Sequence, residues 1–176
     1  MTLEKLNALS SRDAVTFFRQ CCGSAGWVSR MEQRRPFRDA ADLRRAALEV
    51  WNGLTHADWK EAFSHHPKIG DLGSLRAKFA ATAHLAQGEQ SGVARTPEPV
   101  LRALADANAL YEAKFGYIFI VCATGKSAEE MLAILNGRLD NLPGDEIVIA
   151  ALEQAKITAL RLDKLLGHLA GGRSDS

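Results

Sequence analysis

The sequence contains little cysteine, with three thiols among 176 residues, at Cys21, Cys22 and Cys122. This arrangement matches neither a disulfide framework nor the paired spacing of a zinc site, so we expect a reducing compartment. Long apolar runs are also missing, because no window approaches the roughly 18 residues of a membrane-spanning helix. The first 15 residues, MTLEKLNALSSRDAV, are too polar for a secretory signal. We therefore expect a cytoplasmic protein with no membrane partner.

A net charge of one sign is missing as well, because 22 basic residues nearly balance 21 acidic ones. A balanced chain has no bulk attraction for nucleic acid, so we expect a small-molecule partner instead. A basic run does occur within residues 30–38, where four arginines lie close together: Arg30, Arg34, Arg35 and Arg38. No aromatic residues interleave with these arginines, which favours a solvated face over a phosphate-binding patch. Binding of a protein partner by this basic run is the alternative interpretation.

A length of 176 residues and a hydrophobic content of 47% are sufficient for one domain with a sizeable core. Apolar residues recur at helical spacing nearly throughout the chain. The sequence therefore predicts an all-α domain of about eight helices over residues 1–170, followed by a polar tail over residues 171–176. The expected helices include residues 13–22, 39–52, 55–64, 97–114 and 143–169, with others starting near Leu3, Ser74 and Ser127.

One apolar segment departs from the helical pattern. Residues 117–123 read YIFIVCA and have the propensity of a buried strand. No second strand is evident to pair with them, so we expect an extended segment wedged between helices, whose backbone groups could hydrogen-bond to a flat, amide-rich ligand. The following Gly125-Lys126-Ser127 is not a phosphate-binding loop, because Ile120 stands where that motif requires glycine. Ser127 and Glu130 instead have the spacing of a helix capping box.

The candidate site centres on residues 65–71, reading HHPKIGD, and on residues 88–92, reading GEQSG. Histidine can exchange a proton near neutral pH, and Pro67 biases the backbone of His66 toward an extended conformation. Glu89 and Gln90 add a carboxylate and an amide, which together with His66 could form a proton-transfer site. A purely structural His-Pro turn is the alternative interpretation of the same residues.

Other reactive side chains favour the same chemistry by exclusion. His65 and His66 are adjacent and should point in different directions, and the remaining histidines are isolated, so no metal site is expected. Cys122 lies in an apolar run, where a thiol is normally inert. With a metal site and a cysteine nucleophile excluded, the residues favour acid–base chemistry without a cofactor.

Two polar residues fall on apolar helix faces. Asn108 either braces a loop or faces a ligand, and the bracing role is favoured. Arg161 should be half buried on the last helix, where it either pairs with a carboxylate or reaches a bound anion. Helical geometry alone favours the structural ion pair.

Four separated segments stand out when they are read together: residues 66–71, residues 88–91, residues 108–123, and residues 138–141 together with Glu146, Glu153, Ile157, Arg161 and Leu162. In this order they resemble the family of decarboxylases that act on 2-oxo-4-hydroxy-4-carboxy-5-ureidoimidazoline (OHCU) in urate degradation. The resemblance implies an all-α homodimer that needs no cofactor and converts OHCU to S-allantoin in purine catabolism. A helical adaptor and a non-catalytic binder of a ureido or imidazole ligand are the alternative functions.

The resemblance also implies roles for individual residues. His66 would donate or shuttle a proton, with Glu89 and Arg161 completing the catalytic set. The implied substrate contacts are Pro67, Ala86, Gln87, Gly88, Glu89, Gln90, Phe119, Ile120, Val121, Cys122 and Ala123. Many family members carry a serine at the position of Ala86, so one polar substrate contact is expected to be missing here or supplied by Gln87.

Overall fold

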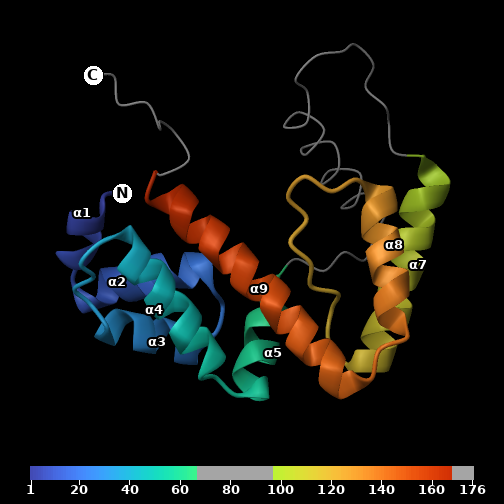
Figure 1. The fold of residues 1–176 in the computed structure, drawn as a ribbon, viewed down its shortest axis with the longest axis horizontal. Helices are drawn as coiled ribbons and strands as arrows, with labels where there is room; N and C mark the ends of the chain where they lie inside the picture. The colour runs from blue at the N-terminus through green and yellow to red at the C-terminus, as the bar shows by residue number, and fades with distance from the viewer. Residues whose placement is uncertain (67–96, 168–176) are drawn as a thin grey trace, which may run out of the picture. The chain divides into compact units, whose positions relative to one another are not determined.

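The computed structural model describes residues 1–66 and 97–167, and every regular element in these two ranges is an α-helix (Figure 1). The prediction of an all-α fold is therefore confirmed for these residues, while the helix expected after Ser74 lies outside them. The helices are α1 (Leu3–Asn7), α2 (Ser11–Cys21), α3 (Ala25–Gln33), α4 (Ala40–Asn52), α5 (His56–Ser64), α7 (Glu98–Phe115), α8 (Ala128–Leu139) and α9 (Pro143–Leu165). No helix among them is long and apolar enough to cross a membrane.

The chain divides into two compact units. The first contains residues 1–65 and the chain from Ala151 onward, and the second contains residues 66–150. Helix α9 starts in the second unit and continues into the first.

Side-chain caps determine where the helices of the first unit begin. Ser10, Ser24 and Asp39 each accept a hydrogen bond from a backbone N–H in the first turn of α2, α3 and α4. Thr55 forms a full capping box with Asp58 at the start of α5. Each such cap stabilises its helix by about 1 kcal/mol, so short polar residues between apolar runs are sufficient to set these boundaries.

Buried tryptophans form much of the core of the first unit. The Trp27 indole N–H donates to the carbonyl oxygen of Ala47 at 3.0 Å, and that of Trp51 donates to Ala151 at 2.9 Å. Trp51 also stacks on Trp59 with ring centroids 6.0 Å apart. Because each buried indole N–H has a partner, these large rings add apolar contact area without an unsatisfied polar group.

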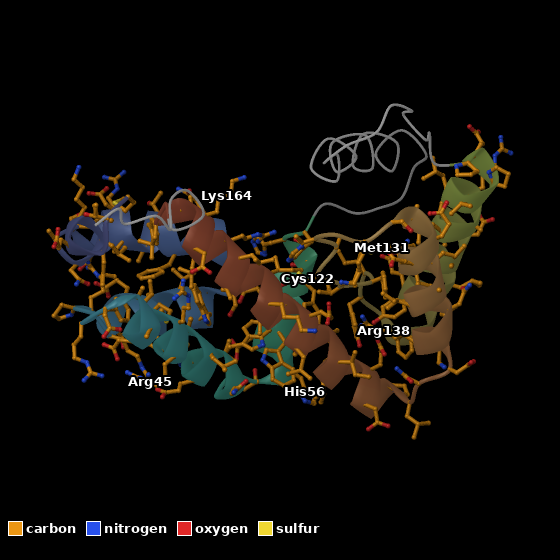
Figure 2. The ribbon with its side chains drawn as sticks, turned by 45° about the horizontal axis from the view of Figure 1, so that its top comes forward. Arg45, His56, Cys122, Met131, Arg138 and Lys164 are labelled. Atoms are coloured by element: carbon orange, nitrogen blue, oxygen red, sulfur yellow. The ribbon has the colours of Figure 1, made fainter. Side chains whose placement is uncertain are left out.

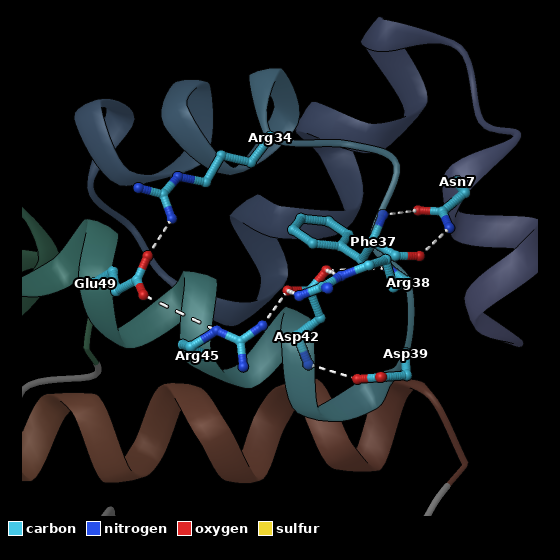
Figure 3. Close-up of polar contacts among 8 residues, drawn as sticks. All are labelled: Asn7, Arg34, Phe37, Arg38, Asp39, Asp42, Arg45 and Glu49. Carbon is cyan, nitrogen blue, oxygen red and sulfur yellow. Dashed lines mark hydrogen bonds and ion pairs between the residues drawn. The ribbon is translucent and has the colours of Figure 1, made fainter.

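The basic run of residues 30–38 is held by contacts within the first unit. Figure 3 shows Arg34 paired with Glu49 at 2.6 Å and Arg38 paired with Asp42 at 3.0 Å, both at the surface. Arg35 is different, because its side chain is only 10% exposed and donates to the carbonyl oxygen of Leu9 at 2.7 Å. The solvated-face interpretation is therefore wrong for Arg35, whose guanidinium hydrogen-bonds to carbonyl groups at and just after the end of α1.

In the second unit, α7 and α8 lie side by side (Figure 1). Helix α7 ends at Phe115, and its C-cap is Gly116, whose φ of 74° is a left-handed conformation that glycine adopts without steric cost. Residues 118–123 then follow with neither helix nor strand, as expected for the extended apolar segment. Helix α8 begins with the predicted capping box of Ser127 and Glu130.

The predicted end of α9 is wrong by about one turn. The helix stops at Leu165 instead of residue 169, and the chain turns at Gly167, where φ is 74°. A glycine in the left-handed conformation ends the helical hydrogen-bond pattern. The prediction followed the apolar spacing, which continues beyond Gly167, and gave that glycine too little weight.

Candidate functional site

The structure describes part of the predicted site. His66, Arg161 and residues 119–123 lie within the described ranges. Pro67 and residues 86–90, which include Glu89, lie outside them. His66 and residues 119–123 belong to the second unit, and Arg161 belongs to the first.

The two adjacent histidines have different surroundings. His65 caps the end of α5, is exposed, and places its Nδ1 atom 2.9 Å from the carbonyl oxygen of Glu61. A Cβ atom on Gly23 would lie 2.5 Å from the Cβ of His65, so glycine at this position allows the α2–α3 turn to pack against His65. His66 follows and is half buried. His65 thus has a structural role, which leaves His66 as the histidine to consider for chemistry.

Arg161 is half buried on α9, as its helical position predicted. Its Nη1 atom donates to the carbonyl oxygen of Cys21 at 3.2 Å. No ion pair of Arg161 is found within residues 1–66 and 97–167, so the structural carboxylate partner that helical geometry favoured is not present there. An arginine that is oriented by one carbonyl group still has further N–H donors for an anion.

The neighbouring thiols do not add a nucleophile. Burial raises the pKa of Cys21 to about 12 and that of Cys22 to about 11. Both are therefore neutral thiols at pH 7, and a neutral thiol is a poor nucleophile and metal ligand.

Residues 119–123 form an apolar segment that is largely buried. Phe119, Ile120 and Val121 are buried, whereas Cys122 and Ala123 are half buried. Side chains hold two of the carbonyl groups: Ile120 accepts from Arg138 Nη1 at 2.8 Å, and Cys122 accepts from Lys126 Nζ at 3.0 Å. Long cationic side chains thus hydrogen-bond to this backbone. In the described part of the chain, no neighbouring strand does so.

Asn108 bonds within its own helix, whereas the sequence favoured a role in bracing a loop. It is buried, and its Nδ2 atom donates to the carbonyl oxygen of Leu104 one turn earlier in α7 at 2.8 Å. Among the described residues, the Nδ2 group of Asn108 is therefore bonded within its own helix and not to a loop.

Sequence reasoning gave no role to Arg138 and Glu146, although both belong to the segments that carry the resemblance. In the structure they form a buried ion pair with Nε and Oε1 2.7 Å apart. Apart from that resemblance, the sequence signal was an arginine in the last turn of α8 and a glutamate in the first turn of α9, and such charges are usually solvated.

A hollow lies in the first unit, between α4 and residues 152–162 of α9. It has a volume of about 440 Å³, and none of the predicted site residues line it. Its walls are mainly apolar and include Leu48 and Leu152, which are 49% and 53% exposed. An exposed apolar face of this kind is typical of a surface that contacts another protein chain.

Comparison with known families gives a match to the OHCU decarboxylase model over residues 7–163. The chain belongs to the OHCU decarboxylase family. The family predicted from the four sequence segments is therefore confirmed, and the match extends across both units.

Individual relatives agree with this assignment. The uric acid degradation bifunctional protein TTL of Arabidopsis thaliana is 38% identical over 154 residues, which cover 87% of this chain and 47% of that protein. This chain thus spans about half the length of TTL. The 2-oxo-4-hydroxy-4-carboxy-5-ureidoimidazoline decarboxylase of Amia calva is 30% identical over 178 residues, covering 94% of this chain and 95% of the relative.

Solved structures support the fold. A crystal structure of OHCU decarboxylase in the presence of (S)-allantoin matches with a TM-score of 0.71 and 38% identity, covering 85% of this chain and 96% of that one. An (S)-allantoin synthase structure matches with a TM-score of 0.70 at 18% identity, covering 93% of this chain and 53% of that one. The second likeness is one of fold alone.

Proposed function

We propose that this OHCU decarboxylase family member removes CO2 from OHCU and releases S-allantoin. The observation that carries the proposal is the family match over residues 7–163, which includes the His66 segment, the Glu89 segment and Arg161. The domain extends over residues 1–170, and residues 171–176 are a polar tail.

The substrate supplies the electron sink for this reaction. The bond between the ring carbon and its carboxylate breaks, and the electron pair moves into the adjacent carbon–nitrogen double bond while CO2 leaves. The hydroxyl group then loses its proton as its carbon becomes a carbonyl, while the ring nitrogen is protonated and the neighbouring ureido-bearing carbon gains a proton on one face. The protein's part is to hold the carboxylate, stabilise the developing charge and deliver that proton, so no cofactor is required.

Each predicted residue has a part in this scheme. His66 donates or shuttles the proton, Glu89 orients the substrate hydroxyl or the imidazole, and Gln90 hydrogen-bonds to a ring amide. Arg161 supplies a positive charge for the anionic substrate. Pro67 and the backbone of residues 119–123 form the wall of the pocket. Ala86 cannot make the polar contact that serine makes in many family members, and Gln87 could supply that contact instead.

The enzyme acts as a cytoplasmic homodimer in this proposal. The apolar face that includes Leu48 and Leu152 supports association with a second chain, because such faces are seldom left in water. The same face is what a helical adaptor would need, so the assay of turnover distinguishes the two functions.

The direct test is to supply freshly generated OHCU to the purified protein in a metal chelator, with no added cofactor, and to follow optically active allantoin by circular dichroism. We expect S-allantoin to form much faster than racemic allantoin forms by spontaneous decay. OHCU binding without CO2 release would indicate a non-catalytic binder, and no binding would favour the adaptor. Activity lost in chelator and restored by one metal would overturn the cofactor-free scheme.

Replacement of Cys122 tests whether the pocket wall acts through backbone or thiol. Cys122→Ser should leave kcat/KM within about tenfold of the parent, because the thiol lies in an apolar run and its backbone is the proposed ligand contact. The measurement is steady-state turnover of OHCU with folding checked by circular dichroism. A folded Cys122→Ser protein with no activity would indicate a cysteine nucleophile.

A further inference from the structure

A buried polar cluster lies where α8 ends and α9 begins, entirely within the second unit. Arg138, labelled in Figure 2, is 7% exposed, and Glu146 is fully buried. Glu146 accepts hydrogen bonds from Arg138 Nε at 2.7 Å, from the Tyr111 hydroxyl, and from Asn141 Nδ2 at 2.6 Å. Both carboxylate oxygens are therefore satisfied, and the arginine charge is compensated.

Such a pair is not explained by stability alone. Removing two charges from water costs about as much as their attraction returns, and apolar residues of similar volume often serve as well. Burial and the nearby Glu146 raise the pKa of Tyr111, so its hydroxyl stays protonated and donates to the carboxylate. The cluster is thus a fixed arrangement of donors around the Glu146 carboxylate. Arg138 also contacts a segment of the chain outside the cluster.

The segment that Arg138 contacts is the extended apolar segment. Arg138 Nη1 donates to the carbonyl oxygen of Ile120 at 2.8 Å, and the Cζ atom lies 4.7 Å from the centre of the Phe119 ring. Residues 118–123 have no regular secondary structure, so the contact fixes backbone that no ladder of hydrogen bonds holds in the described residues. We propose that Arg138 is a positioning residue that holds Phe119 and Ile120 in the conformation needed to contact the substrate. This inference rests on the proposed function.

Arginine is required for this role because of its shape. The planar guanidinium directs Nε and Nη2 toward Glu146 while Nη1 points to Ile120. Lysine has a single ammonium group at the end of a flexible stem, so it can neutralise Glu146 but cannot hold both partners in the same geometry. Arg138→Lys therefore separates charge compensation from positioning.

We expect Arg138→Lys to lower kcat/KM for OHCU on the order of 10- to 100-fold, mainly through a higher KM, because a displaced segment loses contacts that bind the substrate in both the ground state and the transition state. Amide hydrogen exchange, measured by mass spectrometry, should become faster over residues 119–121 and stay unchanged in α7 and α8 away from the cluster. The matched control is Arg102→Lys, which alters an exposed pair with Glu98 in the same unit and should change neither measurement.

Two further variants keep the test decisive. Arg138→Met with Glu146→Gln removes both charges together, so it should fold even if Arg138→Lys does not, and it should show the same rise in KM and in exchange. Leu104 is a fully buried residue of α7, so Leu104→Ala creates a cavity in the core and should lower the melting temperature. It should leave KM within about twofold of the parent when the assay is run well below that temperature.

Unchanged KM and unchanged exchange in either folded Arg138 variant would overturn the proposal. A rise in KM for Leu104→Ala equal to that for Arg138→Lys would also overturn it, because the effect would then follow stability and not position. If the parent does not turn over OHCU, the proposed function fails, while the exchange of residues 119–121 still reports whether Arg138 holds the segment.

Discussion

His66→Ala is expected to lower kcat for OHCU decarboxylation on the order of 10²- to 10⁴-fold, the usual contribution of a positioned acid or base. The melting temperature should change little, because His66 is half buried in the turn after α5 and is not part of the core. The comparison that isolates its role is His65→Ala. That ring is exposed and lies against its own helix, so its loss should leave kcat within a few-fold of the parent.

Both variants should be assayed with freshly generated OHCU, and the spontaneous decay should be subtracted from each progress curve. The optical activity of the product gives a second measurement, because allantoin from spontaneous decay is racemic. Parent-like kcat for His66→Ala, or an equal loss for the two histidine variants, would remove His66 from the mechanism.

The helices were predictable because local residues determine them. Ser127 and Glu130 were recognised as a capping box from their spacing, and the structure contains that box. The extended segment after Gly116 was also predictable, because its β-branched and aromatic residues had no second strand to pair with. The end of α9 was missed because Gly167, and not the apolar spacing, stops the helix.

Contacts between residues distant in sequence were not predictable in the same way. Arg35 belongs to a basic run, yet it donates to carbonyl groups at the end of α1, 26 residues earlier in the case of Leu9. Arg138 meets Ile120 and Tyr111 only because α7, α8 and the connecting segment fold together. A charged residue gives the same sequence signal whether it is solvated or enclosed by such partners, so these roles depend on the fold.

The buried cluster leads to the largest expected effect on stability. Glu146→Ala should lower the free energy of unfolding by about 3–5 kcal/mol, because it leaves the Arg138 charge buried without its partner. It also removes the acceptor of the Tyr111 hydroxyl and of Asn141 Nδ2. Folded domains are stable by about 5–15 kcal/mol in total, so this single substitution should bring the protein close to unfolding.

Urea denaturation of the parent and variants measures this difference from the midpoint and slope of the transition. The paired variant Arg138→Met with Glu146→Gln should be less destabilised than Glu146→Ala, because no unpaired charge remains in the interior. Arg102→Ala is the control for an exposed pair: its side chain is 66% exposed, and its loss should cost less than about 1 kcal/mol. If Glu146→Ala costs no more than Arg102→Ala, then water reaches the Arg138 charge in solution, and the enclosure of the guanidinium between Glu146 and Ile120 is contradicted.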